Sequence, residues 1–541
     1  MNDDDVDMEL LGLTEQYLRD MEANGWETYD EDKSGNFQVD QATDYYNGSC
    51  GPTRSAVAYA DSPLGMFFYF LPKELWVRIA DESNRYREQN ITAVATSRRK
   101  KLLVRQAKDP RISVPNLEEI EENLAKFKRI QDHEIVHVIA LFFARAIAPI
   151  RDGLSKHWCV DEEGAIPRGT FSRFMKRGRF EDIMTYLHFN SNPDVGAHAD
   201  KAWKICPVLQ VVERTFRRGY RLGKVISFDE GMMPNRSKFN PMRIFMPDKP
   251  SKNGTKFYMT CCAKTAYCSR NTLGLDPKAV IRNISKALSN QDRKRLIVTD
   301  SYYSTVSLSL KLLETGLYHV GTTRTDRLSW SPFHFTQQKR PRRMRRGTYR
   351  IAQARDHPGL VALSWMDSKP VNMLATGCST MSTSMLRTEK GGTRSTVPCP
   401  QLVVDYGLGM GGLDVHDQLR LQRYSIQKCI SLHKYYKQLF LCIVDMAVVN
   451  GYTIHPDTLK KKGEKLPTHA EYLRRLHAQL LALRTINFET YMNSEDLVSG
   501  PVSRPQHTLG NTTDLRDQLL LSAVLGNIWG TCAALSSCPT S

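Results

Sequence analysis

The sequence lacks a CxxC pair, although it contains 12 cysteines. Cysteines scattered in this way fit neither a zinc-binding motif nor a disulfide framework. We therefore expect no zinc site, and we expect most cysteines to be buried thiols in a reducing compartment. The apolar runs Phe67–Leu71 and Val136–Phe143 are far shorter than the roughly 20 residues of a membrane-spanning helix. The opening MNDDDVDMELL is acidic and has no signal-peptide pattern, which predicts an intracellular protein with no membrane partner.

Two common kinds of catalytic motif are also missing. The glycines that end at Gly412 are not followed by the Gly-Lys-Ser/Thr of a nucleotide-binding loop. No Ser, His and Asp set suggests a nucleophilic hydrolase, and His188 has no partner at metal-ligand spacing. We expect His188 to be a core residue.

Acidic residues are too few to balance the basic ones. The 75 Lys and Arg residues exceed the 58 Asp and Glu residues, which gives a formal net charge of +17. A surplus of this size indicates a polyanionic partner, of which nucleic acid is the commonest. With 541 residues, the chain is long enough for several domains.

The order of predicted elements indicates an α/β region that follows a helical one. Helical periodicity predicts helices at Glu134–Ile150, Gly169–His188, Trp203–Tyr220, Pro277–Leu288, Ser301–Leu313 and Tyr435–Ile454. Runs of β-branched and aromatic residues predict strands at Val225–Phe228, Ile244–Met246, Phe257–Cys262, Leu296–Thr299, Tyr318–Thr322, Leu360–Met366 and Val371–Leu374. Thr376–Pro400 is rich in Ser, Thr and Gly, which predicts a linker.

Acidic residues follow two of these strands and begin one helix. Asp229 and Asp300 each end an apolar run, and ligand sites in open α/β sheets gather at the carboxyl ends of strands. Asp414 and Asp417 stand at i, i+3, so both face one side of a helix that we expect to begin near Asp414. Helix capping is the alternative role for Asp414. Three such carboxylates could hold two divalent cations, and Mg²⁺ prefers carboxylate oxygens.

Basic residues surround the first acid and recur in three other places. The candidate contacts to a polyanion are Arg236, Lys238, Arg243, Lys249, Lys252, Lys256 and Arg324. The segment Gln337–Arg350 is densely basic, and DNA-backbone contact and a solvated loop fit it equally well. The cluster Ser97–Leu102 fits a nuclear localisation signal, phosphate contacts or a solvated helix face.

Four motifs give the chain a clear family resemblance. They are SFDEGMMPNRSKF…MPDKPSKNGTKFYMTCCAKTAY, LIVTDSYYSTVSLSLKLLETGLYHVGTTRTDR, WMDSKPVNMLAT and MGGLDVHDQL. With SPLGMFFYFLPKELW and GRFEDIMTYLHFN upstream, the chain resembles the piggyBac transposases and the proteins derived from such elements. The resemblance runs from about Ser62 to Tyr452.

This resemblance implies an RNase H-like catalytic core in which a mixed sheet is flanked by helices. It implies a catalytic triad of Asp229, Asp300 and Asp414, with Asp417 as a further metal ligand, and two Mg²⁺ ions that Mn²⁺ would replace. The implied function is cut-and-paste transposition at TTAA sites, in which a homodimer in the nucleus acts on double-stranded DNA at the transposon ends. The alternative is a domesticated or inactive DNA-binding protein.

The resemblance also implies a division into domains. A mostly helical dimerisation and DNA-binding domain would be split between residues 62–223 and 425–500. The catalytic core would comprise residues 224–332 and 405–424, with an insertion domain at 333–404. Residues 1–61 and 501–541 are expected to be mostly disordered, although Glu9–Met21 could form a short amphipathic helix. The family's cysteine-rich zinc-binding domain looks absent, because only Cys532 and Cys538 occur in the tail.

Overall fold

A computed structural model describes residues 14–29, 37–161, 164, 168–192, 200–235, 237–247, 252–273, 279–388, 392–421 and 424–489. The chain divides into two compact units. Unit 1 comprises Met1–Tyr46, Arg293–Gly411 and Met492–Ser541, and unit 2 comprises Asn47–Asp292 and Gly412–Tyr491. This division differs from the domain boundaries that the resemblance implies, which stay a prediction. The predicted disordered tail, 501–541, lies outside the described residues.

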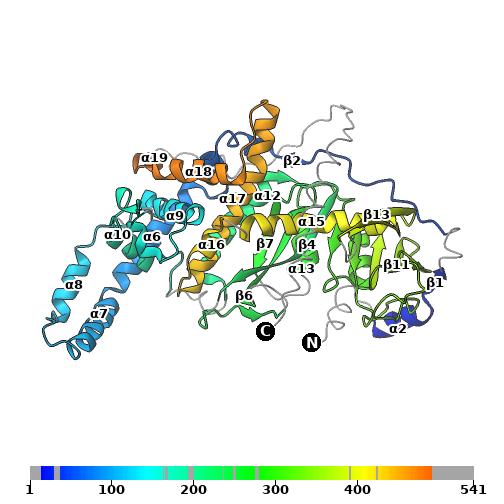
Figure 1. The fold of residues 1–541 in the computed structure, drawn as a ribbon, viewed down its shortest axis with the longest axis horizontal. Helices are drawn as coiled ribbons and strands as arrows, with labels where there is room; N and C mark the ends of the chain where they lie inside the picture. Colours follow the sequence, from blue (N-terminus) through cyan, green and yellow to red (C-terminus); the bar gives the residue numbers. More distant parts are fainter. Residues whose placement is uncertain are drawn as a thin grey trace. The chain divides into compact units, whose positions relative to one another are not determined.

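Unit 1 is built on a run of six strands in the order β1-β10-β11-β12-β9-β8. Figure 1 labels β1 and β11 of this run. The strands are β1 (Trp26–Tyr29), β8 (Leu296–Thr299), β9 (Tyr318–Thr322), β10 (Tyr349–Ala354), β11 (Leu360–Met366) and β12 (Pro370–Thr376). β8 and β9 pair in parallel and the other pairs are antiparallel, so the sheet is mixed. The four residues of β8 are all buried, as their continuous apolar sequence predicts.

The strands predicted for a separate insertion extend the sheet of unit 1 instead. β12 pairs with β9, so β10, β11 and β12 continue the sheet that contains β8. The predicted linker at Thr376–Pro400 is also wrong, because β13 (Ser382–Thr388) and β14 (Arg394–Pro400) form an antiparallel hairpin. Alternating Ser and Thr positions allow this hairpin to expose one face and cover the other.

The expectation that residues 1–61 are disordered is wrong for the described part of that segment. Helix α2 (Glu15–Asn24) is capped by Thr14, and β1 pairs with β10 through the register Trp26↔Ala354. Met21 and Trp26 enter the apolar core of unit 1. Two large buried side chains therefore anchor a stretch whose overall composition is polar.

In unit 2, three long or medium strands and one short strand pair side by side. β4 (Val225–Pro234) pairs antiparallel with β6 (Asn253–Cys262), and β5 (Arg243–Phe245) and β7 (Cys268–Leu273) pair with β6. Helix α13 (Ala279–Ala287) packs on β6 and β7, and α12 (Cys206–Gly219) packs on β7. A short pair, β2 (Gly51–Pro52) with β3 (Tyr220–Arg221), ties the chain near residue 50 to the end of α12.

Helices from distant parts of the sequence pack together in unit 2, as the predicted split helical domain requires. The early helices are α4 (Arg54–Val57), α5 (Pro63–Phe70), α6 (Lys73–Gln89), α7 (Ile91–Gln106), α8 (Leu117–Ala125), α9 (Asp132–Ile147) and α10 (Arg177–Tyr186). The late ones are α16 (Ile426–Cys429), α17 (Tyr435–Lys461), α18 (His469–Leu481) and α19 (Ile486–Glu489). The helical hairpin of α7 and α8 extends away from α6 and α10 (Figure 1).

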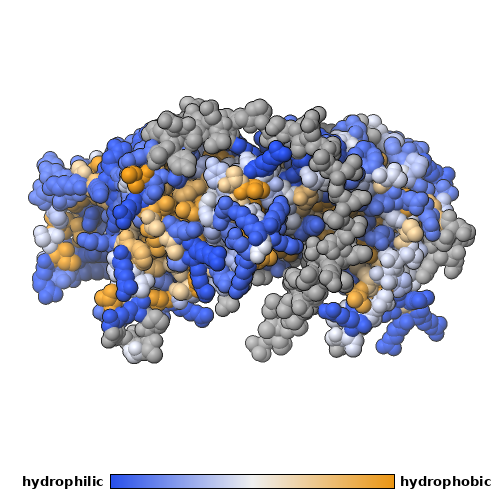
Figure 2. Space-filling model, turned by 90° about the horizontal axis from the view of Figure 1, so that it is seen from above, coloured by the Kyte–Doolittle hydropathy of each residue, from blue (hydrophilic) through white to orange (hydrophobic). Residues whose placement is uncertain are grey.

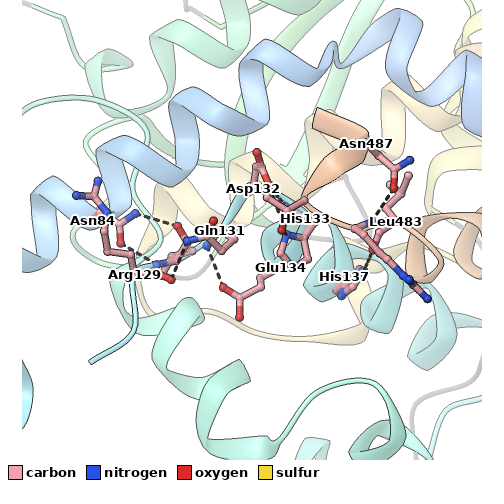
Figure 3. A network of polar contacts seen from close by, with 12 residues as sticks. Asn84, Arg129, Gln131, Asp132, His133, Glu134, His137, Leu483 and Asn487 are labelled. Atoms are coloured by element: carbon pink, nitrogen blue, oxygen red, sulfur yellow. Dashed lines mark hydrogen bonds and ion pairs between the residues drawn. The ribbon is translucent and has the colours of Figure 1, made fainter. Parts of the chain in front are cut away.

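A polar network joins the two sets of helices (Figure 3). His137 on α9 lies 3.0 Å from the carbonyl oxygen of Leu483, at the end of α18. Asn84 on α6 exchanges two 2.9 Å hydrogen bonds with the backbone of Ile130, just before α9. These directional contacts fix α9 against α6 and α18, which bury its apolar residues.

Helix α17 begins at Tyr435 as predicted and runs to Lys461, beyond the predicted end at Ile454. Among the described helices it alone passes the length and composition test for a membrane span, but 83% of the relevant window is buried inside the fold. Its contacts with α5 and α12 explain that burial. The helix is therefore the apolar centre of unit 2.

Helix α15 spans Gln401–Leu421 and includes the glycines that were predicted to precede it. A Cβ on Gly409 would lie 2.4 Å from Val298 Cγ2 in unit 1, and one on Gly412 would lie 2.6 Å from Ala263 Cα in unit 2. These glycines are thus required by close packing rather than by a turn. Asp414 is the fourteenth residue of α15, so its predicted alternative role as a helix cap is excluded.

Alanine substitutions at two glycines of α15 separate the effect of packing from the effect of helix propensity. We expect Gly409→Ala to destabilise the protein by about 1–3 kcal/mol, because the stiff Val298 side chain would have to move. Gly407→Ala is the matched control, since its Cβ would meet nothing nearer than Met385 Cε at 4.0 Å. That control should gain about 0.5–1 kcal/mol from helix propensity. Urea unfolding measures both, and equal effects of one sign would contradict the packing argument.

Candidate active site and nucleic-acid interface

Asp229 lies inside a strand rather than at its end. β4 continues to Pro234 because Gly231–Pro234 keeps pairing with β6, and Asp229 stands opposite Met259. Its side chain is partly exposed between the buried residues Phe228 and Glu230, and its Oδ1 accepts a 2.7 Å hydrogen bond from the Glu230 N–H. The position keeps a carboxylate open to solvent within an otherwise buried part of the strand.

Asp300 occupies the predicted position directly after β8. β8, α14 (Val306–Glu314) and β9 form a parallel βαβ unit, and the carboxyl end of β8 carries the acid. The Tyr302 N–H donates to Asp300 Oδ1 at 3.0 Å, and the Ser304 N–H donates to its carbonyl oxygen at 3.1 Å. The turn that follows β8 therefore fixes both the backbone and the side chain of Asp300.

A buried chain of hydrogen bonds supports this turn. Ser304 Oγ donates to the Asp300 carbonyl oxygen at 2.7 Å and lies 2.7 Å from Thr299 Oγ1. Thr299 Oγ1 lies 2.9 Å from His319 Nε2, and His319 Nδ1 lies 2.8 Å from Ser309 Oγ. His319 is fully buried, and burial lowers its pKa to about 3. The neutral ring can accept at one nitrogen and donate at the other, which satisfies two hydroxyl groups. Sequence analysis missed this chain, because hydroxyl residues carry no periodic signal.

The C-terminal half of α15 is fixed to β4 by a buried cation. Arg420 is 1% exposed, donates to the Met232 carbonyl oxygen at 3.3 Å and lies over the Phe257 ring. Its main partner is Asp417, whose Oδ1 accepts at 2.8 Å and 3.2 Å. Asp417, predicted as a metal ligand, thus serves as the counter-ion of Arg420. Asp414, one turn earlier, is exposed.

The predicted basic residues fall into three groups. Lys238, Arg243, Lys252 and Arg324 are exposed, as contacts to a polyanion require. Lys256 is 8% exposed with its Nζ 3.8 Å from Glu230, so the structure contradicts its predicted role as a DNA contact. The strand position explains the error, since Lys256 pairs with Met232 inside the β4–β6 ladder. Arg236 and Lys249 lie outside the described residues.

The basic segment Gln337–Arg350 has a defined structure in unit 1. The Gly347 N–H donates to the Met366 carbonyl oxygen at 2.8 Å, and Arg346 pairs with Asp367 at the end of β11. Arg350 is half-buried and donates to the His334 carbonyl oxygen, whereas Lys339, Arg340, Arg342, Arg343 and Arg345 are exposed. Figure 2 colours residues by hydropathy, and on the face that it draws hydrophilic side chains are interspersed with apolar ones. The segment therefore presents a fixed row of positive charge.

The buried histidines give a testable dependence of stability on pH. Burial lowers the pKa of His319 to about 3 and the pKa values of His188 and His416 to about 4, whereas an unfolded histidine titrates near 6.5. The unfolded state therefore binds more protons between these values, so stability falls as the pH drops below about 6.5. Each histidine contributes up to about 1.4 kcal/mol per pH unit.

We expect His319→Gln to reduce the dependence of the free energy of unfolding on pH, because up to about one proton fewer is taken up on unfolding. The free energy of unfolding in urea, measured between pH 7.5 and 5.5, should fall less steeply than in the unsubstituted protein. Gln retains one donor and one acceptor and does not titrate in this range. An unchanged slope would show that His319 is already charged in the fold.

Comparisons with known proteins agree with this architecture. The sequence profile of the transposase family described as Transposase IS4 matches residues 62–452. A curated relative, PiggyBac transposable element-derived protein 2 of Homo sapiens, is 24% identical over 297 residues. That match covers 52% of this chain and 48% of the relative, so the chain matches about half of the relative's length.

A solved structure extends the agreement to the fold. It is described as a piggyBac transposase synaptic complex with hairpin DNA, and it matches with a TM-score of 0.61 at 19% identity. The match covers 85% of this chain and 90% of that chain, which confirms the predicted RNase H-like core with flanking helices. Because the family profile spans well over half of the residues, the chain belongs to the piggyBac transposase family.

Proposed function

We propose that the protein is a DNA transposase that cleaves and joins strands with divalent cations. The position of Asp300 carries the proposal, because a carboxylate at the carboxyl end of a buried parallel strand is fixed by its own turn and by a buried hydrogen-bond chain. Asp229 and Asp414 complete the proposed triad, and Glu230, the residue after Asp229 on β4, is a further carboxylate of that strand.

Oxygen donors of this kind suit Mg²⁺, with Mn²⁺ as a substitute. Two cations would supply Lewis acidity to the attacking and leaving oxygens of a phosphodiester. The protein's own contribution is to hold carboxylates in place and to bind phosphates. Asp417 would support this set through Arg420, because its Oδ1 is engaged by that guanidinium.

The proposed substrate is double-stranded DNA with transposon ends, cut and inserted at TTAA sites by a homodimer. The net charge of +17 supports a DNA partner, and the solved relative is described with hairpin DNA. The exposed residues Lys238, Arg243, Lys252 and Arg324 would contact phosphates. The exposed Arg98–Lys101 cluster on α7 supports the proposal of a nuclear protein.

A second candidate is a DNA-binding protein derived from a transposase without catalysis. Its support is that Asp417, one carboxylate of the proposed ligand set, is engaged by Arg420. The curated relative is also named as an element-derived protein. Cleavage and binding must therefore be measured together.

The first experiment is Mg²⁺-dependent cleavage of a duplex that carries the repeats flanking the gene, compared with Asp300→Asn. Asn keeps the oxygen that accepts from the Tyr302 N–H but loses the charge that a cation needs. We expect cleavage to fall by more than the roughly 10–100-fold cost of a lost outer contact, with DNA affinity unchanged. Asp356→Asn, an exposed acid, is the control. Binding without cleavage by the unsubstituted protein would select the second candidate.

The basic segment of unit 1 can be tested through salt. Replacing Arg342, Arg343 and Arg345 with Gln should reduce the slope of log affinity against log salt by up to about 2.7, since each phosphate contact contributes about 0.9. A matched change of three exposed cations on α7, Arg99, Lys100 and Lys101, shows whether the loss is specific to the segment. An unchanged slope for the first variant would show that these three arginines face solvent and do not contact DNA phosphates.

A further inference from the structure

Two cysteines from distant parts of the sequence lie together in unit 2. Cys50 Sγ lies 3.9 Å from Cys262 Sγ, although 212 positions separate them. The pairing of β2 with β3 brings Cys50 to this place, where its Sγ also lies 3.8 Å from the Tyr220 hydroxyl. Cys262 is the last residue of β6. The fold itself therefore holds the two thiols in contact.

The residue above the pair leaves room for both sulfur atoms. A Cβ on Gly223 would lie 3.0 Å from Cys50 Sγ and 3.7 Å from Cys262 Sγ. Gly223 does not have a positive φ, so the backbone conformation does not require glycine here. Glycine is favoured because a side chain would crowd the Cys50 sulfur. A larger residue at this position would displace the Cys50 sulfur from its partner.

The two thiols differ in access and in chemical environment. Cys50 is exposed, whereas Cys262 is fully buried. Hydrogen bonding from the Cys50 thiol, and then from Thr265 and the Gly223 N–H, lowers the pKa of Cys262 and favours its thiolate. An accessible thiol next to a thiolate is the arrangement in which oxidation of the first is resolved by the second.

A second pair provides an internal comparison. Cys261 and Cys268 stand opposite each other on β6 and β7, but both are fully buried. Solvent cannot deliver an oxidant to either sulfur. Proximity is thus common to both pairs, and access distinguishes them.

We propose that Cys50 and Cys262 are the site of a reversible disulfide formed by hydrogen peroxide. The Cys50 thiol passes its proton to the neighbouring Cys262 thiolate as the Cys50 sulfur attacks one peroxide oxygen, which breaks the O–O bond and gives a sulfenic acid and hydroxide. The hydroxide then removes the proton from Cys262 and becomes water. The Cys262 thiolate then attacks the Cys50 sulfur and displaces the second hydroxide. Two thiols lose two electrons and two protons, and one peroxide becomes two waters. A thiol reductant reverses the reaction through a mixed disulfide.

The disulfide would form beneath the helix that carries Asp414. A Cβ on Gly412 would lie 2.7 Å from the Cys262 carbonyl oxygen, so α15 rests directly on the modified residue. Closing the sulfur separation to the bond length of about 2.05 Å requires a shift of Cys50, the residue on the exposed side. The site is independent of the proposed transposase activity, so either conclusion can fail alone.

The test is a peptide map of the full chain after treatment with hydrogen peroxide and blocking of free thiols. We expect the Cys50–Cys262 disulfide to be the main cross-link and to disappear on treatment with dithiothreitol. Cys50→Ser should abolish it, whereas Cys159→Ser, a change at a half-buried cysteine, should leave it intact. Thermal unfolding of both variants verifies that they are folded.

A further variant tests the geometry without removing sulfur. Gly223→Ala should reduce the yield of the cross-link severalfold, because its Cβ would occupy the space next to Cys50 Sγ. The proposal is overturned if Cys261–Cys268 or any other pair cross-links in place of Cys50–Cys262. It is also overturned if Cys50 accumulates only as sulfinic acid, since Cys262 would then not resolve the sulfenic acid.

Discussion

The close approach of α15 to its neighbours is the constraint on which the candidate site depends. Gly409 contacts Val298, two residues before Asp300 and within the same unit, and Gly412 contacts the backbone at Ala263. Each contact is closer than any side chain would allow. The helix that carries Asp414 can approach its neighbours this closely because Gly409 and Gly412 have no side chains. Arg420 holds the last turns of the helix to β4.

The side of the acidic residues that faces solvent differs in charge from the side that faces the protein interior. Toward solvent, Asp229 and Asp414 are accessible to a cation. Toward the interior, polar groups are either neutral or paired: His319 is kept neutral by burial, and Arg420 is kept charged by Asp417. An interior without net charge costs less desolvation energy and can hold its hydrogen bonds without water. Hydrogen-bonded groups in the interior therefore support carboxylates that are themselves open to solvent.

Much of this arrangement could be predicted from sequence because apolar runs and acids are local signals. Leu296–Thr299 and Asp300 were placed correctly, since a buried strand reads as a continuous apolar run. The extent of β4 and the start of α15 were not, because both depend on a partner. Gly407–Gly412 resemble a turn until Val298 and Ala263 are known to lie against them. Lys256 resembles a surface cation until its pairing with Glu230 is seen.

The same distinction applies to the cysteines. Scattered cysteines without a CxxC pair suggested inert buried thiols, and for Cys261 and Cys268 the burial agrees. Cys50 differs only because a two-residue strand pair carries it to the end of β6. Neither β2 nor β3 has a sequence pattern that predicts such a pairing, since each spans two residues. The reactivity proposed for Cys50 therefore follows from its position in the fold. Composition does not distinguish Cys50 from the other cysteines, but the fold makes it the exposed member of a pair of adjacent thiols.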